Sequence, residues 1–188
     1  IYTREREEEL IKAKWVNGIY KNIWIDQFRK MSKLAYQESS LVTSLFEQAR
    51  QLQIELGCPP EKTAVTPNGI RVENLQNIAG NEVKINIGAV LRVTPIKDVK
   101  TMIQAFAFAK AKEPRLKLWI MGPWDEDEEY AKECFELSET LGLSEDIEFT
   151  GRINIKDYLG RMDMTILTSV SEGQPLTILE SYAAHKPV

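Results

Sequence analysis

From residue 83 onward, short apolar runs alternate with longer segments whose apolar residues recur every three or four positions. The short runs, expected to be strands, cover residues 83–90, 116–121, 147–150 and 163–169. The segments between them, expected to be helices, cover about residues 98–112, 127–141 and 155–162. Strands that alternate with helices form parallel sheets covered by helices on both faces. The sequence therefore predicts an α/β fold with a doubly wound, Rossmann-like parallel sheet.

The first part of the chain predicts a smaller α/β segment. Residues 3–38 have helical spacing, interrupted by the turn-forming pair Asn17-Gly18. A short strand over 41–43 precedes a capping-box pattern from Ser44 to Glu47, which predicts a helix to about residue 56. A second strand, expected over 62–66, leads into Pro67-Asn68-Gly69-Ile70 and a polar loop that extends to residue 82.

Ligands of open parallel sheets bind outside the carboxyl ends of the strands. Arg92, Gly122 and Glu172 all follow predicted strands, so they are candidates for a binding site. Arg92 and Lys97 share one loop, where a guanidinium and an ammonium group could hold a diphosphate. The alternative for this pair is two ordinary surface charges.

The stretch from Ser171 to Val188 (SEGQPLTILESYAAHKPV) predicts a loop followed by a helix. Ser171 and Gln174 form a capping-box pattern, and Pro175 is tolerated in a first helical turn. Glu172 then lies in the loop and Glu180 on the helix, about one turn from its start. Because unpaired N–H groups at a helix N-terminus suit a diphosphate, and carboxylates can accept sugar hydroxyls, this stretch could hold a sugar nucleotide. The alternative is an amphipathic surface helix with two solvated glutamates.

This block, with the apolar run of residues 163–169 before it, resembles the Glu-seven-residues-Glu signature of retaining glycosyltransferases of family four, in the GT-B superfamily. Within that family, SEGQPLTILE and the early segment YTREREEEL are most similar to the PelF-type enzymes of exopolysaccharide synthesis. His185 departs from the pattern, since the family usually has glycine there.

The resemblance implies a role for each candidate residue. Glu180 would hold the donor ribose and Glu172 the donor sugar, while Arg92 and Lys97 would hold the diphosphate. Separately from the resemblance, Gly122 could let the backbone approach a nucleoside base. Further donor contacts would come from the start of the final helix, namely Gly173, Gln174, Pro175 and Leu176.

The resemblance also implies a domain organisation. Residues 1–68 would be the end of the acceptor-side domain, because a Pro-Asn-Gly-hydrophobic tetrad closes that domain in the family. Residues 69–82 would be the hinge, and residues 83–188 the donor-binding domain. Both ends of the sequence are typical of a piece of a longer protein.

The implied reaction is transfer of a hexose or N-acetylhexosamine from a nucleotide sugar, expected to be UDP-linked, to a saccharide acceptor with retention. Exopolysaccharide synthesis and association with membrane polysaccharide-export proteins are implied by the resemblance alone. Two alternatives stay open. One is a phosphorylase of the same fold, and the other is a nucleotide-sugar-binding module or inactive relative without transfer activity.

Composition argues against other classes of protein. A net charge of −4 without a basic block does not favour nucleic-acid binding. No apolar run reaches the length of a membrane span, and Cys58 and Cys134 lack metal-ligand spacing, so free thiols in a reducing cytoplasm are expected. The acidic run from Asp125 to Glu129 is interpreted as a helix cap and solvated face rather than a metal motif. No metal or other cofactor is expected.

Overall fold

The computed structural model describes residues 18–72, 75 and 83–188, and the chain divides into two compact units, Ile1–Asn68 and Gly69–Val188. The predicted helix before Gly18 and the YTREREEEL segment lie outside the described residues, as does most of the predicted loop up to residue 82. Each unit is a small α/β assembly with its own core.

The first unit pairs two short parallel strands beside a long helix. Its elements, in order, are α2 (Gly18–Glu38), β1 (Val42–Ser44), α3 (Glu47–Glu55) and β2 (Thr63–Val65). Its buried core consists of Tyr36, Val42 and Cys58, with Leu56 packed against them. These elements confirm the predicted helix–strand–helix–strand order.

Ser44 does not cap α3 as predicted. The cap position is Phe46, without a side-chain hydrogen bond, because Ser44 is the last residue of β1. Its carbonyl accepts a hydrogen bond from the Thr66 amide at 2.7 Å, and its hydroxyl donates to Gln53 at 2.7 Å. Strand pairing therefore takes the residue that the capping-box pattern assigned to the helix.

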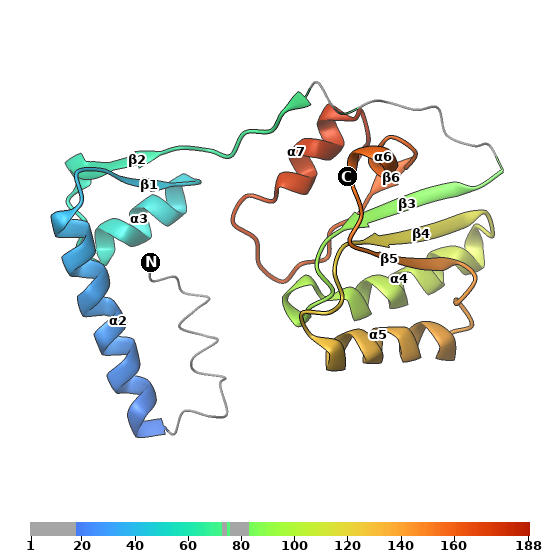
Figure 1. Cartoon of the computed structure of the whole chain (residues 1–188), viewed down its shortest axis with the longest axis horizontal. Helices are drawn as coiled ribbons and strands as arrows, with labels where there is room; N and C mark the ends of the chain where they lie inside the picture. Colours follow the sequence, from blue (N-terminus) through green and yellow to red (C-terminus); the bar gives the residue numbers. More distant parts are fainter. Residues whose placement is uncertain (1–17, 73–74, 76–82) are drawn as a thin grey trace. The chain divides into compact units, whose positions relative to one another are not determined.

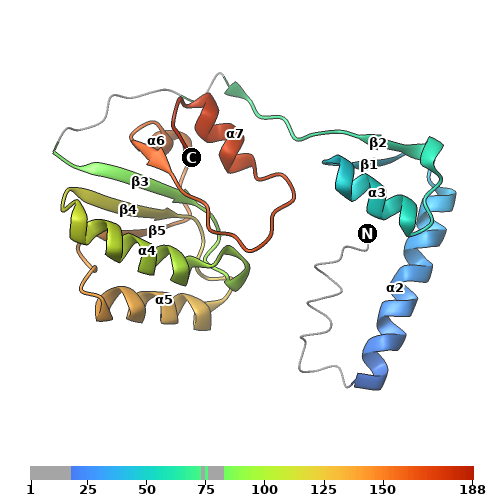
Figure 2. The same cartoon turned by 180° about the vertical axis from the view of Figure 1, so that it is seen from behind.

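The second unit is a four-stranded parallel sheet with helices on both sides. Its elements, in order, are β3 (Ile85–Val90), α4 (Val99–Lys112), β4 (Leu116–Met121), α5 (Glu128–Thr140), β5 (Ile147–Gly151), α6 (Lys156–Leu159), β6 (Met164–Thr165) and α7 (Leu176–Ala183). The strand order is β5-β4-β3-β6. Helices α4 and α5 lie on one side of the sheet, and α6 and α7 on the other (Figures 1 and 2).

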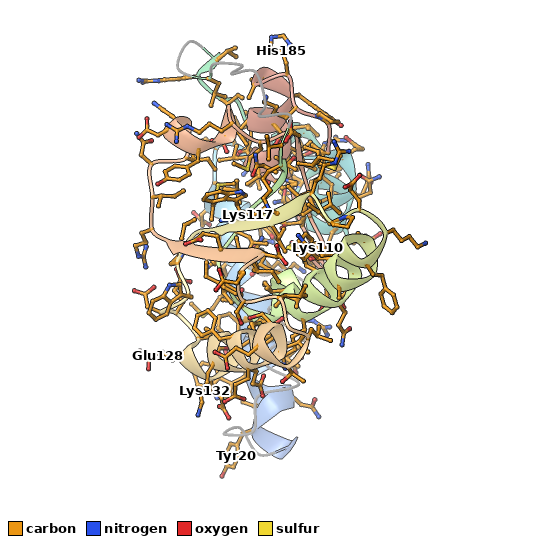
Figure 3. The ribbon with its side chains drawn as sticks, turned by 90° about the vertical axis from the view of Figure 1, so that its right-hand side faces the viewer. Tyr20, Lys110, Lys117, Glu128, Lys132 and His185 are labelled. Atoms are coloured by element: carbon orange, nitrogen blue, oxygen red, sulfur yellow. The ribbon has the colours of Figure 1, made fainter. Side chains whose placement is uncertain are left out.

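Alternation along the strands explains this arrangement. In β4, Leu116, Leu118 and Ile120 are buried toward α4 and α5, while Lys117 and Trp119 between them are only partly buried. Trp119 donates a hydrogen bond to the side-chain oxygen of Asn86 on β3 at 2.9 Å. Figure 3 labels Lys117 on this strand, where its ammonium lies 4.5 Å from the Trp119 ring centroid. Apolar residues on one side of each strand thus hold the first two helices.

The last strand is shorter than the predicted run of residues 163–169. The Ile166 amide still donates to the Gly88 carbonyl of β3 at 2.9 Å. Beyond it, the chain hydrogen-bonds to the loop that follows β3 instead of to β3 itself, because β3 ends at Val90. The first half of the run therefore forms a strand as predicted, whereas its second half is part of the candidate site.

Both cysteines are free thiols, as predicted, and both are buried. Burial is the main reason that the pKa of Cys134 is raised to about 11, so this side chain is a neutral thiol at pH 7. No helix among the described residues combines the length and apolar character that crossing a membrane requires.

Three helices end in the same hydrogen-bonded motif, with a residue of positive φ after the cap. That residue is Gly57 after α3 and Gly142 after α5. After α7 it is His185, with φ of 57°. After α7, the His185 amide donates to the Tyr182 carbonyl at 3.0 Å and the Lys186 amide to Ser181 at 2.8 Å. This is the Schellman pattern, in which glycine is usual. His185 therefore ends the helix as a C-terminal cap, in the position where the family usually has glycine, and its exposed side chain points outward (Figure 3).

We expect position 185 to tolerate glycine and to resist β-branched residues. His185→Val should lower the free energy of unfolding by about 1–2 kcal/mol, since a left-handed conformation is costly for such a side chain. His185→Gly should stay within about 1 kcal/mol of the parent, because relief of strain offsets the added chain entropy. Urea denaturation measures both, and equal stability of the two variants would contradict the account.

Candidate functional site

The order of strands reverses between β3 and β6, which is where a ligand crevice is expected. The chain moves from β3 to β4 and β5 in one direction, then returns to place β6 on the opposite side of β3. Such a reversal leaves a crevice at the carboxyl ends of the two strands that diverge from it. The loops that follow β3 and β6 carry Arg92, Lys97 and Glu172, so these three predicted site residues come from the edges of one crevice.

Backbone and hydroxyl hydrogen bonds join these two loops. The Val170 amide donates to the Ile96 carbonyl at 2.9 Å. The Thr168 hydroxyl donates to the carbonyls of Lys97 at 3.0 Å and Asp98 at 3.1 Å. Asp98 has a φ of 47° and accepts a hydrogen bond from the Thr101 amide, which starts α4. The position of Lys97 is thus fixed by the second loop and by the start of the helix.

Lys97 and Glu172 form an ion pair across the joined loops. Their side chains are 17% and 22% exposed, so the pair is largely shielded from water. Burial acts to raise the pKa of Glu172, but the hydrogen bond from Lys97 and the nearby positive charges outweigh it, and the pKa is lowered overall. Glu172 is therefore a carboxylate at neutral pH, held beside an ammonium group.

Two buried hydroxyls in the same loops were not identified from the sequence. Thr94 lies between Arg92 and Lys97, and Ser169 lies three positions before Glu172. Neither hydroxyl oxygen has a hydrogen-bond partner among the described residues. Ser169 contributes to the lowered pKa of Glu172, although the two side chains do not reach the geometry of a hydrogen bond. Their burial without a partner, in the loops that carry the ion pair, makes both hydroxyls candidate ligand contacts.

Arg92 is more exposed than Lys97 and has a different partner. Its guanidinium Nη1 lies 3.0 Å from Oε2 of Glu126, in the loop after β4. Its charge also contributes to the lowered pKa of Glu172. Arg92 is thus near the ion pair, as its position on the loop predicted, but the contact with Glu126 was not predicted.

The N-terminus of α7 has no side-chain cap. The cap residue is Pro175, and the helix begins at Leu176, so the predicted capping box from Ser171 to Gln174 is wrong. The physical reason is that the residue before a proline is disfavoured in helical conformation, which keeps Gln174 outside the helix. Pro175 itself has no side-chain group that could accept a hydrogen bond from the first N–H groups of α7. The other predicted contacts, Gly173 and Leu176, are exposed beside this terminus.

Glu180 lies on α7, four residues after Leu176 and on the same side of the helix. It is half-buried, and its carboxylate makes no hydrogen bond or ion pair with another described residue. The structure thus puts Glu172 before the helix and Glu180 within it, as the spacing predicted.

Gly122 allows the segments that follow β3 and β4 to lie very close together. Its φ is 146°, and a Cβ atom at this position would lie 2.0 Å from the Leu91 carbonyl oxygen. The Leu91 amide donates to Met121, and the Gly122 amide donates to Gly151 at 3.1 Å. This close approach is enough to explain why the position needs glycine, with no ligand involved. A contact between Gly122 and a nucleoside base therefore stays a prediction.

The acidic run before α5 includes the helix cap that the sequence predicted. The Asp127 carboxylate accepts a hydrogen bond from the Tyr130 amide at 3.0 Å. Asp125 pairs with Arg152 at 3.3 Å. Across the described part of the chain, no group of three or more histidine, cysteine or acidic side chains is arranged to hold a metal ion.

Comparison with known proteins agrees with this architecture. Residues 72–188 match the family model "Glycosyl transferases group 1", and residues 1–61 match a domain of unknown function, DUF3492. Because the first match covers more than half of the sequence, this chain belongs to the group 1 glycosyltransferases.

Individual relatives are distant. A D-inositol 3-phosphate glycosyltransferase from Geodermatophilus obscurus is 24% identical in an alignment 165 residues long, which covers 79% of this chain and 37% of that protein. Anabaena HepE in complex with UDP and glucose superposes with a TM-score of 0.74 at 22% identity, over 85% of this chain and 46% of its own. TarM of S. aureus gives a TM-score of 0.71 at 18% identity, over 87% of this chain and 31% of its own. These structures establish the GT-B type of fold, and the chain spans less than half the length of each of these proteins.

We expect Gly122→Ala to be far more destabilising than Gly142→Ala. Both glycines have positive φ, but only Gly122 meets another backbone, while a Cβ at Gly142 has no neighbour within 4 Å. Gly142→Ala should cost about 1–2 kcal/mol from strain alone. Gly122→Ala should cost about 3 kcal/mol or more, or prevent folding, because the Leu91 backbone must move. If urea denaturation showed similar losses of unfolding free energy for the two variants, the close approach of Gly122 to Leu91 would be contradicted.

The Lys97–Glu172 pair should make stability depend on pH in one direction. A carboxyl whose pKa is lowered on folding stabilises the protein above its ordinary pKa of 4.5, and this contribution disappears as the pH falls through the lower folded value. Glu172→Gln should therefore cost about 1–3 kcal/mol near pH 7. The difference from the parent should shrink toward pH 3.

The control for this measurement is Glu145→Gln, which removes an exposed charge elsewhere in the same unit. It should show little difference from the parent at either pH. A loss for Glu172→Gln that is equally large at both ends of the pH range would show that the carboxylate does not act through its charge.

Proposed function

We propose that residues 69–188 bind the donor of a retaining glycosyltransferase, a UDP-linked hexose or N-acetylhexosamine. The observation that supports this most directly is the Lys97–Glu172 ion pair, because Glu172 lies in the loop that leads to the N-terminus of α7. A largely shielded ammonium, a carboxylate and the N–H groups of a helix N-terminus are the complementary partners of a diphosphate and a sugar.

Each part of the donor has a matching group. Lys97 and Arg92 bind the diphosphate together with the first N–H groups of α7, near Leu176. Glu172 accepts hydroxyls of the transferred sugar, and its lowered pKa keeps it an acceptor at neutral pH. Glu180 accepts the ribose hydroxyls, consistent with a carboxylate that has no other partner among the described residues.

Gly173, Gln174 and Pro175 complete the donor contacts between Glu172 and α7. The base lies toward Gly122, directly after β4. These assignments place nucleoside, diphosphate and sugar in order along the loops, with the sugar at the ion pair.

Binding the donor replaces one set of ionic contacts with another. The diphosphate takes Lys97 from Glu172, and the sugar hydroxyls then satisfy the released carboxylate. During transfer the bond between the sugar's anomeric carbon and the β-phosphate oxygen breaks, and a bond from the same carbon to an acceptor hydroxyl oxygen forms on the same face. The acceptor proton passes to the leaving diphosphate, and Lys97 and Arg92 stabilise the charge that develops there. Positive groups of the chain therefore supply the stabilisation without a metal.

The remaining assignments rest on the resemblance. Residues 1–68 contribute to the acceptor side, residues 69–82 form the hinge, and the acceptor is a saccharide. A cytoplasmic role in exopolysaccharide synthesis, with membrane export proteins as partners, follows from the PelF-like form of SEGQPLTILE. If the chain binds a UDP-sugar and the longer protein transfers nothing, the alternative of a binding module is correct.

Glu180→Ala should abolish measurable UDP affinity in this chain, because the ribose hydroxyls lose their acceptor. Tyr182→Ala is the matched control, since Tyr182 is 62% exposed and lies two positions further along α7, on the other side of the helix. Calorimetric titration measures both variants. UDP affinity that survives Glu180→Ala unchanged would refute the assignment of Glu180.

A further inference from the structure

We propose that Glu126 is an internal counter-ion of the diphosphate site, which holds the guanidinium of Arg92 until a donor phosphate displaces it. This inference rests on the proposed function, because it requires that Arg92 binds phosphate. It assigns a role to a residue of the acidic run that neither helix capping nor metal binding explains.

The geometry at Arg92 supports this role. Glu126 Oε2 lies 3.0 Å from Arg92 Nη1, so a carboxylate oxygen occupies the place where a phosphate oxygen would bind. The two residues come from different loops, after β3 and after β4, at the carboxyl edge of the sheet where the ligand is expected. Their side chains are 56% and 35% exposed, so a ligand from solvent can reach the pair.

A second arginine provides Glu126 with an alternative partner. Arg152, after β5, lies 3.9 Å from Oε1 of Glu126 and 3.3 Å from Asp125. When phosphate takes Arg92, the Glu126 carboxylate can shift to Arg152 without losing its charge partner. The loops after three neighbouring strands thus form a chain of alternating charges, from Arg92 through Glu126 to Arg152.

The size of the effect follows from the exposure of the pair. Ion pairs between exposed groups are weak, so competition by Glu126 should be modest and sensitive to salt. Removing the carboxylate should release Arg92 and strengthen the binding of UDP. Removing Arg152 should leave Glu126 more firmly paired with Arg92 and should therefore weaken the binding of UDP.

The test is calorimetric titration of the whole chain with UDP at low salt. Glu126→Gln should bind UDP about two- to fivefold more tightly than the parent, a gain that should fade in about 0.5 M NaCl. Glu128→Gln is the matched control. It removes the same charge two positions away, at the start of α5 (Figure 3), from an exposed residue that forms no ion pair with the described residues, and it should bind like the parent.

A mutant cycle separates action through Glu126 from a direct effect of Arg152. Arg152→Gln should weaken UDP binding in the parent but not in the Glu126→Gln background. A purely structural role for Glu126 would instead appear as a lower free energy of unfolding without tighter binding.

The outcomes distinguish the two levels of the proposal. If the parent binds UDP and Glu126→Gln binds it no more tightly, or if Glu128→Gln gives the same gain, the counter-ion role is wrong and the proposed function stands. If neither the parent nor Glu126→Gln binds UDP, the proposed function and the counter-ion role both fail.

Discussion

The candidate site depends on the hydrogen bonds that join the loop after β3 to the loop after β6. Val170 and Thr168 fix the second loop against Ile96, Lys97 and Asp98. Lys97 and Glu172 are 75 positions apart in the sequence, and these bonds hold the two side chains close enough to pair. The bonds exist because β6 returns to the far side of β3, so a property of the strand order determines the chemistry of the crevice.

The ionic contacts at the crevice have a common character. Lys97 is paired with Glu172, and Arg92 with Glu126, so each cation assigned to the diphosphate already has a carboxylate. The buried pair is protected from solvent and contributes to stability, whereas the exposed pair is screened and exchangeable. In the proposed donor complex both cations change partners, and the exposed pair of Arg92 should exchange more easily than the shielded pair of Lys97.

Most of the second unit could be predicted from the sequence, because its strands and helices have clear and different periodicities. The bounds predicted for β4 match the observed strand, and the order of elements is correct throughout. The errors fall where tertiary contacts compete with local patterns. Ser44 forms part of a strand instead of a cap, Pro175 delays the start of α7, and the second half of the run after Asp163 pairs with a loop. Glu126, Thr94 and Ser169 could not be identified, since their partners or their lack of partners depend on loops that are distant in the sequence.

The central claim is that this chain holds a UDP-sugar through cationic side chains and a helix N-terminus, without a metal. Calorimetric titration with UDP, GDP and ADP, each with and without magnesium, tests it most directly. The account predicts selective binding of UDP with the same affinity in both conditions. Binding that requires magnesium, or the absence of binding to every nucleotide, would contradict it.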